Sequence, residues 1–296
     1  MSALPSRLLP ALALVFNAFT WGVSWWPFRQ LQQAGLHPLW VTALSYLVAV
    51  LVLMLVWPRA LREVLRTPTL WVLVVAAGTT NATFNWAVTT GDVVRVVLLF
   101  YLMPLWAVLL ARLLLDEHIT GRAMLRVVLA LTGALVVLWP DGGLATASTL
   151  LALSGADLLA LLGGFTFALN NVMLKHQAHR SESARAMAMY WGGAVVSLAV
   201  AALLTQAGLA SPLPAPTTLM VAAVLGLAAW FLAANLSLQF GAARLAANTT
   251  SVVMITEVFF ASASAIALGA GVLDLRTAIG GLLIVSAALL AAWQRD

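Results

Sequence analysis

Long apolar runs separated by short polar segments make up almost the whole chain. A membrane-spanning helix needs about 20 mostly apolar residues, and ten runs of roughly that length follow one another along the sequence. The segments between them carry charge and turn-forming residues, as in DEHITGR at 116–122 and SPLPAPT at 211–217. The runs lie near residues 8–26, 39–57, 70–90, 93–115, 123–139, 153–174, 187–205, 217–239, 245–270 and 277–293. This pattern predicts an all-α integral membrane protein with ten transmembrane helices.

Composition indicates the same class of protein. Of the 296 residues, 63% are hydrophobic and 8% are charged, whereas soluble domains average roughly 45–50% apolar and about 25% charged residues. The net charge of +5 comes from basic residues scattered between apolar runs. The chain lacks a basic stretch with interleaved aromatic residues, the pattern that favours nucleic-acid binding. We therefore expect a lipid bilayer as the surroundings and no nucleic acid as a partner.

The distribution of basic residues predicts the orientation in the membrane. If the N-terminus is cytoplasmic and the chain crosses ten times, only Arg29, Arg95 and Arg276 of the 15 Lys and Arg residues fall on the outer side. Cytoplasmic loops are enriched in Lys and Arg, so we expect both termini in the cytoplasm. An error of one helix would reverse the sides partway along and remove this asymmetry, which supports the count of ten.

Three short similarities recur at a separation of about 150 residues. They predict two five-helix repeats, residues 1–142 and 143–296. Because five is an odd number, the second repeat enters the membrane upside down, and inverted repeats around a central cavity suit transport by alternating access. The similarities pair AFTWGVS at 18–24 with GFTFALN at 164–170, Asn85 and Gly91 with Asn235 and Gly241, and TGALVVLW at 132–139 with SAALLAAW at 286–293.

Short motifs occur in two of the runs: Phe19–Thr20–Trp21–Gly22 in the first, and Arg95, Met103–Pro104 and Leu115–Asp116–Glu117 in the fourth. With these motifs the chain resembles the drug/metabolite transporter superfamily, in its ten-helix EamA-like exporter branch. The chain departs from the family pattern in two places: it has Glu257–Val258 where the family often has Glu-Pro, and Asp274 where the family often has Glu.

Within this superfamily the chain is most similar to the aromatic amino-acid exporters of the YddG-like type. The resemblance implies a multi-pass protein of the bacterial inner membrane that exports amino acids or small toxic metabolites. The expected partner is therefore a small-molecule substrate. We expect a monomer without a cofactor, and protons are a candidate coupling ion.

Glu257 is the single charged residue in the ninth run. A charge at bilayer depth costs roughly 2.5–3.5 kcal/mol, so such a residue normally faces the bundle interior or water. Helical spacing places Thr250, Met254, Ala261 and Ser264 on the same face as Glu257, and we expect this face to line a central pathway. Three roles are open for the carboxylate: proton carrier, counter-charge for a substrate ammonium, or structural acceptor for neighbouring hydroxyls.

Asparagines recur in four other runs. Amides cannot carry a proton, but their donors and acceptors can bind both ends of a zwitterion. The alternative role is in helix–helix hydrogen bonds, which contribute about 0.6 kcal/mol each in membranes. Because five runs carry polar residues of these kinds, we expect a shared substrate cavity. The asparagines are Asn17, Asn81, Asn85, Asn170, Asn171 and Asn235.

Aromatic side chains are expected to form the rest of the cavity wall, because their faces accept apolar groups or bind cations. Pro104 lies in the middle of the fourth run, where it removes a backbone hydrogen bond. It predicts either a hinge or a static bend. The aromatic residues of the predicted wall are Phe16, Trp21, Trp86, Tyr101, Phe167 and Trp230.

Enzyme activity is not expected from the motifs. The chain has no GxxxxGK[ST] or HExxH motif, and none of the ten runs contains a His to serve as a base. His176 and His179 lack an obvious third ligand, so we expect no metal site.

Three other functions remain as alternatives. The main one is export of cationic or amphipathic drugs and metabolites by proton antiport. A phosphate-sugar carrier would need a cationic clamp, and Arg95 is the one basic residue near the predicted pathway. A scaffold that transports nothing would not require polar residues in five runs.

Overall fold

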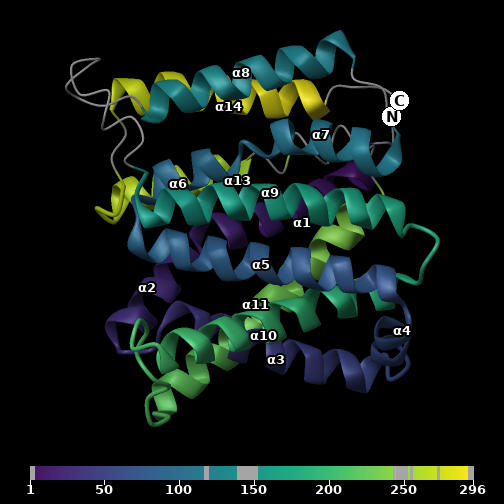
Figure 1. Cartoon of the computed structure of the whole chain (residues 1–296), viewed down its shortest axis with the longest axis vertical. Helices are drawn as coiled ribbons and strands as arrows, with labels where there is room; N and C mark the ends of the chain where they lie inside the picture. The colour runs from purple at the N-terminus through teal and green to yellow at the C-terminus, as the bar shows by residue number, and fades with distance from the viewer. Residues whose placement is uncertain are drawn as a thin grey trace.

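The computed structural model describes residues 4–116, 120–138, 153–242, 244, 253, 256–271 and 274–292. Every regular element within these ranges is a helix (Figure 1), as the hydropathy pattern predicts. The helices are α1 (Leu4–Val23), α2 (Trp25–Gln33), α3 (Pro38–Val56), α4 (Ala60–Arg66), α5 (Pro68–Thr90), α6 (Val93–Phe100), α7 (Met103–Leu115), α8 (Gly121–Leu138), α9 (Gly155–His176), α10 (Glu182–Gln206), α11 (Thr218–Ala242), α13 (Thr256–Ala267) and α14 (Leu275–Ala292).

Length and hydropathy together mark six stretches of the described residues as able to cross a membrane. These stretches are Leu8–Gln33, Pro38–Val56, Val93–Leu115, Gly155–His176, Glu182–Gln206 and Thr218–Leu238. Three shorter apolar helices accompany them, at Val127–Val137, Thr256–Ala267 and Leu275–Ala287. The class of multi-pass α-helical membrane protein is therefore confirmed, while the count of ten crossings stays a prediction.

Two of the predicted runs are broken into two helices each. The first run divides at Ser24, whose hydroxyl donates to the carbonyl of Trp21 at 2.9 Å, and α2 begins one residue later. The fourth run divides at Tyr101 and Leu102, between α6 and α7. Pro104 therefore lies in the first turn of α7 and not in the middle of a helix, and in the first turn its missing N–H is not needed.

Glycines allow several helices to pack in backbone contact. A Cβ on Gly192 of α10 would overlap the carbonyl oxygen of Val74 in α5, and a Cβ on Gly133 of α8 would lie 2.6 Å from the carbonyl oxygen of Gly280 in α14. Small residues at such crossings are how helices approach closely in lipid. These contacts join α5 to α10 and α8 to α14, so each pair combines helices that are far apart in sequence.

The described helices form a layered bundle with two large buried hydrophobic clusters and a smaller third one of Leu110, Ala168 and Val172. In Figure 1, α8 and α14 lie at one end of the bundle and α3 and α10 at the other, with α5 and α9 between them. We call the two large clusters the α3–α10 core and the α6–α13 core. The α3–α10 core includes Leu39, Tyr46, Leu73, Met187 and Phe231. The α6–α13 core includes Val97, Leu99, Tyr101, Ala261 and Ile284.

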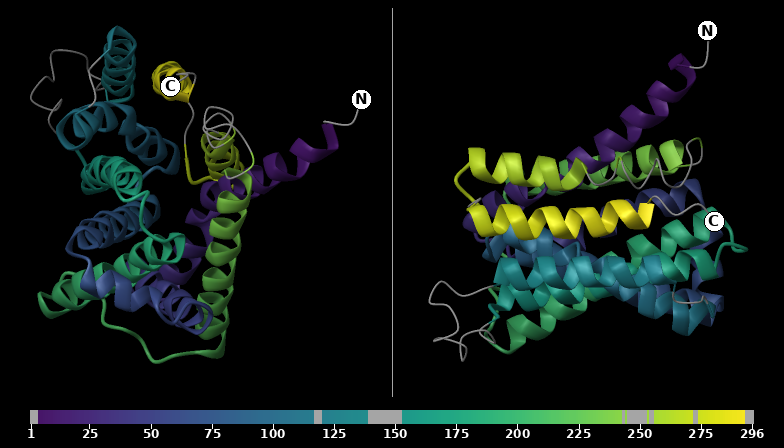
Figure 2. Two further views of the ribbon diagram at one scale, coloured as in Figure 1. Left: turned by 90° about the vertical axis from the view of Figure 1, so that its right-hand side faces the viewer. Right: turned by 90° about the horizontal axis from the view of Figure 1, so that it is seen from above.

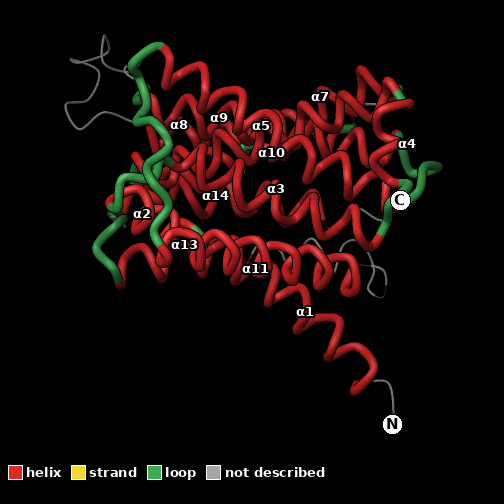
Figure 3. Tube along the Cα trace, turned by 90° about the horizontal axis from the view of Figure 1, so that it is seen from below, coloured by secondary structure: helices red, strands yellow, loops and turns green. Residues whose placement is uncertain are grey.

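Many large hydrophobic side chains are exposed on the outside of the described helices, as expected for helices that face lipid. Large hydrophobic side chains such as Leu55 and Leu113 are more than two-thirds exposed. The N-terminal part of α1 projects from the bundle, which Figures 2 and 3 show from different sides. Leu8, Leu9 and Leu12 on this projecting part are all exposed, so this part of α1 presents apolar side chains to the surroundings.

Candidate functional site

Glu257 lies in the first turn of α13 and points into the protein. Its residue surface is 9% exposed, and Oε2 accepts a hydrogen bond from the hydroxyl of Tyr101 at 3.1 Å. Tyr101 is also buried, at the break between α6 and α7. On the same helix Phe259 is 68% exposed, whereas Ala261 is 1% exposed. The described part of the polar face predicted around Glu257 therefore turns toward the bundle interior.

Close packing of α1 on α13 holds this segment in place. A Cβ on Gly22 would lie 2.8 Å from the carbonyl oxygen of Glu257 and 2.7 Å from the Cβ of Phe260. Phe19, three residues earlier, makes an edge-to-face contact with Phe260 at 5.4 Å between ring centroids. Further along the face, Ser264 accepts a hydrogen bond from the indole nitrogen of Trp25 at 2.9 Å. The FTWG motif of the first run thus supplies the surface against which Glu257 is positioned.

A second group of aromatic and polar side chains lies at the α3–α10 core. Trp21 of α1 stacks on Phe231 of α11, with ring centroids 4.9 Å apart and planes at 9°. Tyr46 of α3 lies 6.0 Å from the same Phe231 ring and donates its hydroxyl proton to Oδ1 of Asn81 at 2.5 Å. Trp230 joins α11 to α1, because its indole nitrogen donates to the Thr20 hydroxyl at 2.6 Å. Helices from both halves of the chain therefore meet around Trp21.

The three tyrosines of the chain share one arrangement that the sequence analysis did not predict, although Tyr101 was expected in the cavity wall. Tyr46, Tyr101 and Tyr190 are all buried, and each hydroxyl donates to an interior acceptor, which for Tyr190 is the carbonyl of Phe231 at 3.0 Å. A Tyr in an apolar run is a signal that could have been used, since a buried phenol requires a partner.

The buried asparagines combine structural bonds with unused acceptors. Asn17 donates to the carbonyl of Ala234 at 2.8 Å, which joins α1 to α11, and Asn85 donates to the Thr42 hydroxyl at 3.1 Å. Oδ1 of Asn17, Asn85 and Asn170 is buried and accepts no hydrogen bond from the described residues. Buried amide oxygens without a donor are rare in folded proteins. Each of these three oxygens is able to accept a hydrogen bond from water or from an ammonium group. The helix-joining and ligand-binding interpretations both apply to these amides.

The other predicted residues are more dispersed. Phe167 packs on Phe100 at the α6–α13 core, with ring centroids 5.3 Å apart. Asn235 is partly buried, while Asn171 and Phe16 are exposed. The structure therefore gathers part of the predicted wall and leaves part of it at the surface. Thr250 and Met254 lie outside the described residues.

Trp86 lies near the C-terminal end of α5, in edge contact with His37 at 5.3 Å between ring centroids. His37 precedes α3, and its Nδ1 accepts a hydrogen bond from the backbone N–H of Leu39 at 3.3 Å. Burial lowers the pKa of His37, because desolvation disfavours the charged ring. The neutral ring needed for this cap is therefore favoured at neutral pH.

Arg95 is paired with an acid that sequence analysis did not identify. Its guanidinium binds Asp157 of α9 through two bonds, Nε to Oδ1 at 2.8 Å and Nη2 to Oδ2 at 3.0 Å. Asp157 also forms a capping box with Ser154 at the start of α9. The Ser-x-x-Asp spacing before an apolar run was the available signal. Because its charge is neutralised, Arg95 is poorly suited to bind a phosphate group.

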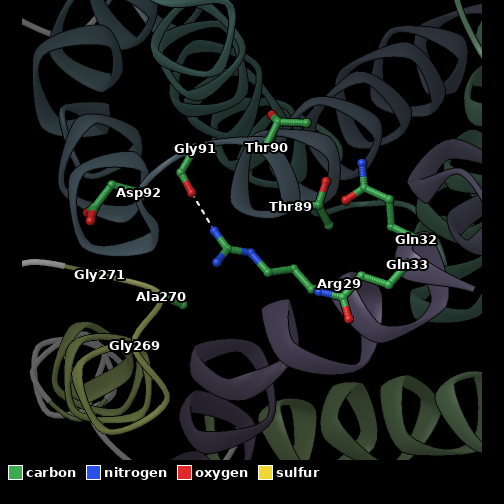
Figure 4. Close-up of a pocket in the computed structure, with 10 residues that line it drawn as sticks. All are labelled: Arg29, Gln32, Gln33, Thr89, Thr90, Gly91, Asp92, Gly269, Ala270 and Gly271. Carbon is green, nitrogen blue, oxygen red and sulfur yellow. Dashed lines mark hydrogen bonds between the residues drawn. The ribbon is translucent and has the colours of Figure 1, made fainter.

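An open pocket of about 470 Å³ lies at the end of the bundle where α2, the α5–α6 turn and the segment after α13 come together (Figure 4). None of its side chains was among the predicted site residues. It is lined by Arg29, Gln32, Gln33, Thr89, Thr90, Gly91, Asp92, Gly269, Ala270 and Gly271. Within the described residues, no group of three His, Cys, Asp or Glu side chains is placed to hold a metal ion.

Comparison with known proteins adds a family match for the first half of the chain. Residues 8–139 match the EamA-like transporter family. An uncharacterized transporter of Pseudomonas aeruginosa is 36% identical over 109 residues, which cover 35% of this chain and 37% of that protein. The expected superfamily is thus matched over residues 8–139, and the aromatic amino-acid exporter branch stays a prediction.

The likeness to a solved structure extends over nearly the whole chain. A crystal structure aligns with a TM-score of 0.57 at 18% sequence identity, covering 96% of both chains. At this identity the likeness shows the fold alone. Together with the helices able to span a membrane, it defines a multi-pass α-helical membrane protein whose N-terminal half is similar to EamA-like transporters.

Proposed function

We propose that the protein is a secondary transporter that exports amino acids, aromatic and other neutral or zwitterionic ones, and related small metabolites across the bacterial inner membrane. The observation that carries this proposal is the buried contact between Glu257 and Tyr101, which joins α13 to the break between α6 and α7. An acid held inside a membrane bundle marks a substrate or ion pathway by default. The match of residues 8–139 to a transporter family supports the same function.

Reciprocal helix packing supports the two inverted repeats that alternating access requires. We pair α1, α3, α5, α6–α7 and α8 of residues 1–142 with α9, α10, α11, α13 and α14 of residues 143–296, in that order. Under this pairing, the contact of α1 with α11 corresponds to that of α9 with α5, and α1 with α13 corresponds to α9 with α6 and α7. The contacts α3–α10, α6–α13 and α8–α14 each correspond to themselves. A packing order that is unchanged when the halves are exchanged is expected of a pseudo-two-fold repeat.

The buried polar groups suggest how a zwitterion is held in the central cavity. The substrate ammonium donates to the unused Oδ1 atoms of Asn17, Asn85 or Asn170, with Glu257 as its counter-charge or as a proton carrier. The stacked pair of Trp21 and Phe231 offers an aromatic surface beside the substrate side chain. Rocking of the halves then exposes the cavity to the other side. The break at Tyr101, with Pro104 at the start of α7, is the proposed hinge.

A second candidate function is export of cationic or amphipathic drugs and metabolites by proton antiport. The buried carboxyl of Glu257 favours it, since one acid can bind either a cation or a proton. A phosphate-sugar carrier is disfavoured because Asp157 neutralises Arg95. In either case we propose a monomer in the inner membrane, with both termini in the cytoplasm.

The test is counterflow of labelled amino acids into proteoliposomes preloaded with the unlabelled compound, with and without an imposed pH gradient. We expect saturable uptake of phenylalanine and of small neutral amino acids above that of protein-free liposomes. Acceleration by the pH gradient would establish proton coupling. Uptake confined to lipophilic cations would favour the second candidate, and no protein-dependent flux of any of these compounds would contradict transport.

A further inference from the structure

The pocket in Figure 4 is distinct from the neighbourhood of Glu257 and lies at the ends of helices. In the proposed orientation, the α1–α3, α5–α6 and α13–α14 connections all face the outer side of the membrane. The pocket would therefore open outward, near the place where an exported solute leaves the protein. Its volume of about 470 Å³ is within the usual range for small-molecule sites, roughly 300–1,000 Å³.

Arg29 supplies the positive charge of this pocket. Its Nε donates to the carbonyl of Val88 at 3.1 Å and its Nη2 donates to the carbonyl of Gly91, at the C-terminal end of α5. The guanidinium also lies over the Trp25 ring, 5.2 Å from the centroid. These bonds fix the direction of the side chain and use only two of the five N–H groups of a guanidinium. The remaining N–H groups are available to a carboxylate, with which Arg forms strong charge-assisted bonds.

Asp92 supplies a negative charge on another wall of the same pocket. Its Oδ1 caps α6 by accepting from the backbone N–H of Arg95 at 2.8 Å. Its Oδ2 is directed toward the Gly271 wall, 3.5 Å from where a Cβ on Gly271 would stand. Asp92 also interacts electrostatically with Arg29, so residues of both charge signs line this pocket.

Neutral polar groups line the rest of the pocket, on the other side of Arg29 from Asp92 (Figure 4). Gln32 and Gln33 of α2 and Thr89 and Thr90 of α5 border the pocket (Figure 4). Gly269 and Gly271 add backbone without side chains. A pocket with one cation, one anion and uncharged donors and acceptors complements a small zwitterion better than an ion of one sign.

We infer that this pocket is an outer binding site for a compact zwitterionic amino acid, with the ligand carboxylate on Arg29 and its ammonium on Asp92. This inference deepens the proposed function by giving the exported solute a second site, although binding to the pocket does not require transport. A pocket that is filled only by water, with Arg29 as a purely structural link, would bind neither end of such a ligand selectively.

Calorimetric titration of the full-length protein in detergent tests this inference. L-alanine carries both charges, whereas propionate carries the carboxylate alone. Titrations are made in the Glu257→Gln background, so that the central acid does not contribute. We expect Arg29→Gln to weaken binding of both compounds by about tenfold or more, the loss typical of a charged hydrogen bond.

Asp92→Asn separates the two ends of the ligand. Asn is as good a helix cap as Asp, so α6 keeps its first turn while the negative charge is removed. We expect weaker binding of L-alanine with unchanged binding of propionate. Arg276→Gln is the matched control, since Arg276 is a basic residue on the same proposed side but does not line the pocket.

The outcomes are decisive in both directions. Equal affinities in the Glu257→Gln parent and in its Arg29→Gln and Arg276→Gln derivatives, or equal loss of both compounds in Asp92→Asn, would overturn the outer site. If Arg29→Gln does not fold, the Asp92→Asn titrations still decide. These results are independent of flux, so a protein that binds propionate through Arg29 but transports nothing would contradict only the proposed function.

Discussion

Gly22→Ala is expected to destabilise the protein, because it disturbs the packing of α1 on α13 that positions Glu257. The added Cβ would lie 2.8 Å from the carbonyl oxygen of Glu257 and 2.7 Å from the Cβ of Phe260, where ordinary contacts are 3.4–4 Å. Both neighbouring atoms are close to the α13 backbone, so no flexible side chain can move aside. The two helices must therefore separate by roughly half an ångström, enough to lose a substantial part of the dispersion energy at this contact.

The expected cost of this separation is about 1–3 kcal/mol, the usual range for overpacking. Helix association in membranes relies on such packing, because lipid supplies no hydrophobic driving force between helices. We expect a lower Tm in detergent and reduced flux in proteoliposomes. Gly226→Ala is the matched control: it is also within a helix, but a Cβ there meets no atom within 4 Å, so Ala should leave the Tm unchanged or raise it. A Gly22→Ala protein as stable and active as Gly226→Ala would refute the reasoning.

Three further substitutions test other contacts. Tyr101→Phe removes the donor to Glu257 and should cost about 1–3 kcal/mol, because a buried acceptor loses its partner; an unchanged Tm would mean that the bond contributes nothing. Asp157→Asn breaks the paired bonds to Arg95 and should lower the Tm in low salt by more than the same substitution at an exposed acid. An equal decrease in Tm at both positions would show that the ion pair does not stabilise the fold. Burial lowers the pKa of His37 in the folded protein. When the pH drops below the usual histidine pKa of about 6.5, the unfolded state therefore binds a proton more readily than the folded state, and the free energy of unfolding decreases. His37→Asn keeps a capping side chain that does not titrate, and thermal melts at pH 7.5 and 5.5 should show a smaller difference than in wild type.

Much of the fold follows from the order of apolar and polar residues. Apolar runs of membrane-spanning length predicted the helical elements, because a backbone in lipid must satisfy its own hydrogen bonds. The interior direction of Glu257 also followed, since neighbours at helical spacing are small while Phe259 is bulky and exposed. These are local properties that the sequence carries by itself.

Other features depend on contacts that spacing does not encode. The helix break at Tyr101 precedes Pro104, whereas the proline alone suggested a bend within a continuous helix. Asp157 was overlooked because its partner, Arg95, is 62 residues away in sequence. The pocket around Arg29 combines three connections from distant parts of the chain. Each required knowledge of which helix ends lie together.

Flux through wild-type and Glu257→Gln proteins, reconstituted in equal amounts, tests whether the buried acid serves transport. The amide of Gln can still accept a hydrogen bond from the Tyr101 hydroxyl, so the variant should fold with a similar Tm. We predict that counterflow of labelled amino acids falls by about tenfold or more, as expected for loss of a charged contact. Counterflow at the wild-type rate by a stable Glu257→Gln protein would show instead that the acid is a structural acceptor and that the pathway lies elsewhere.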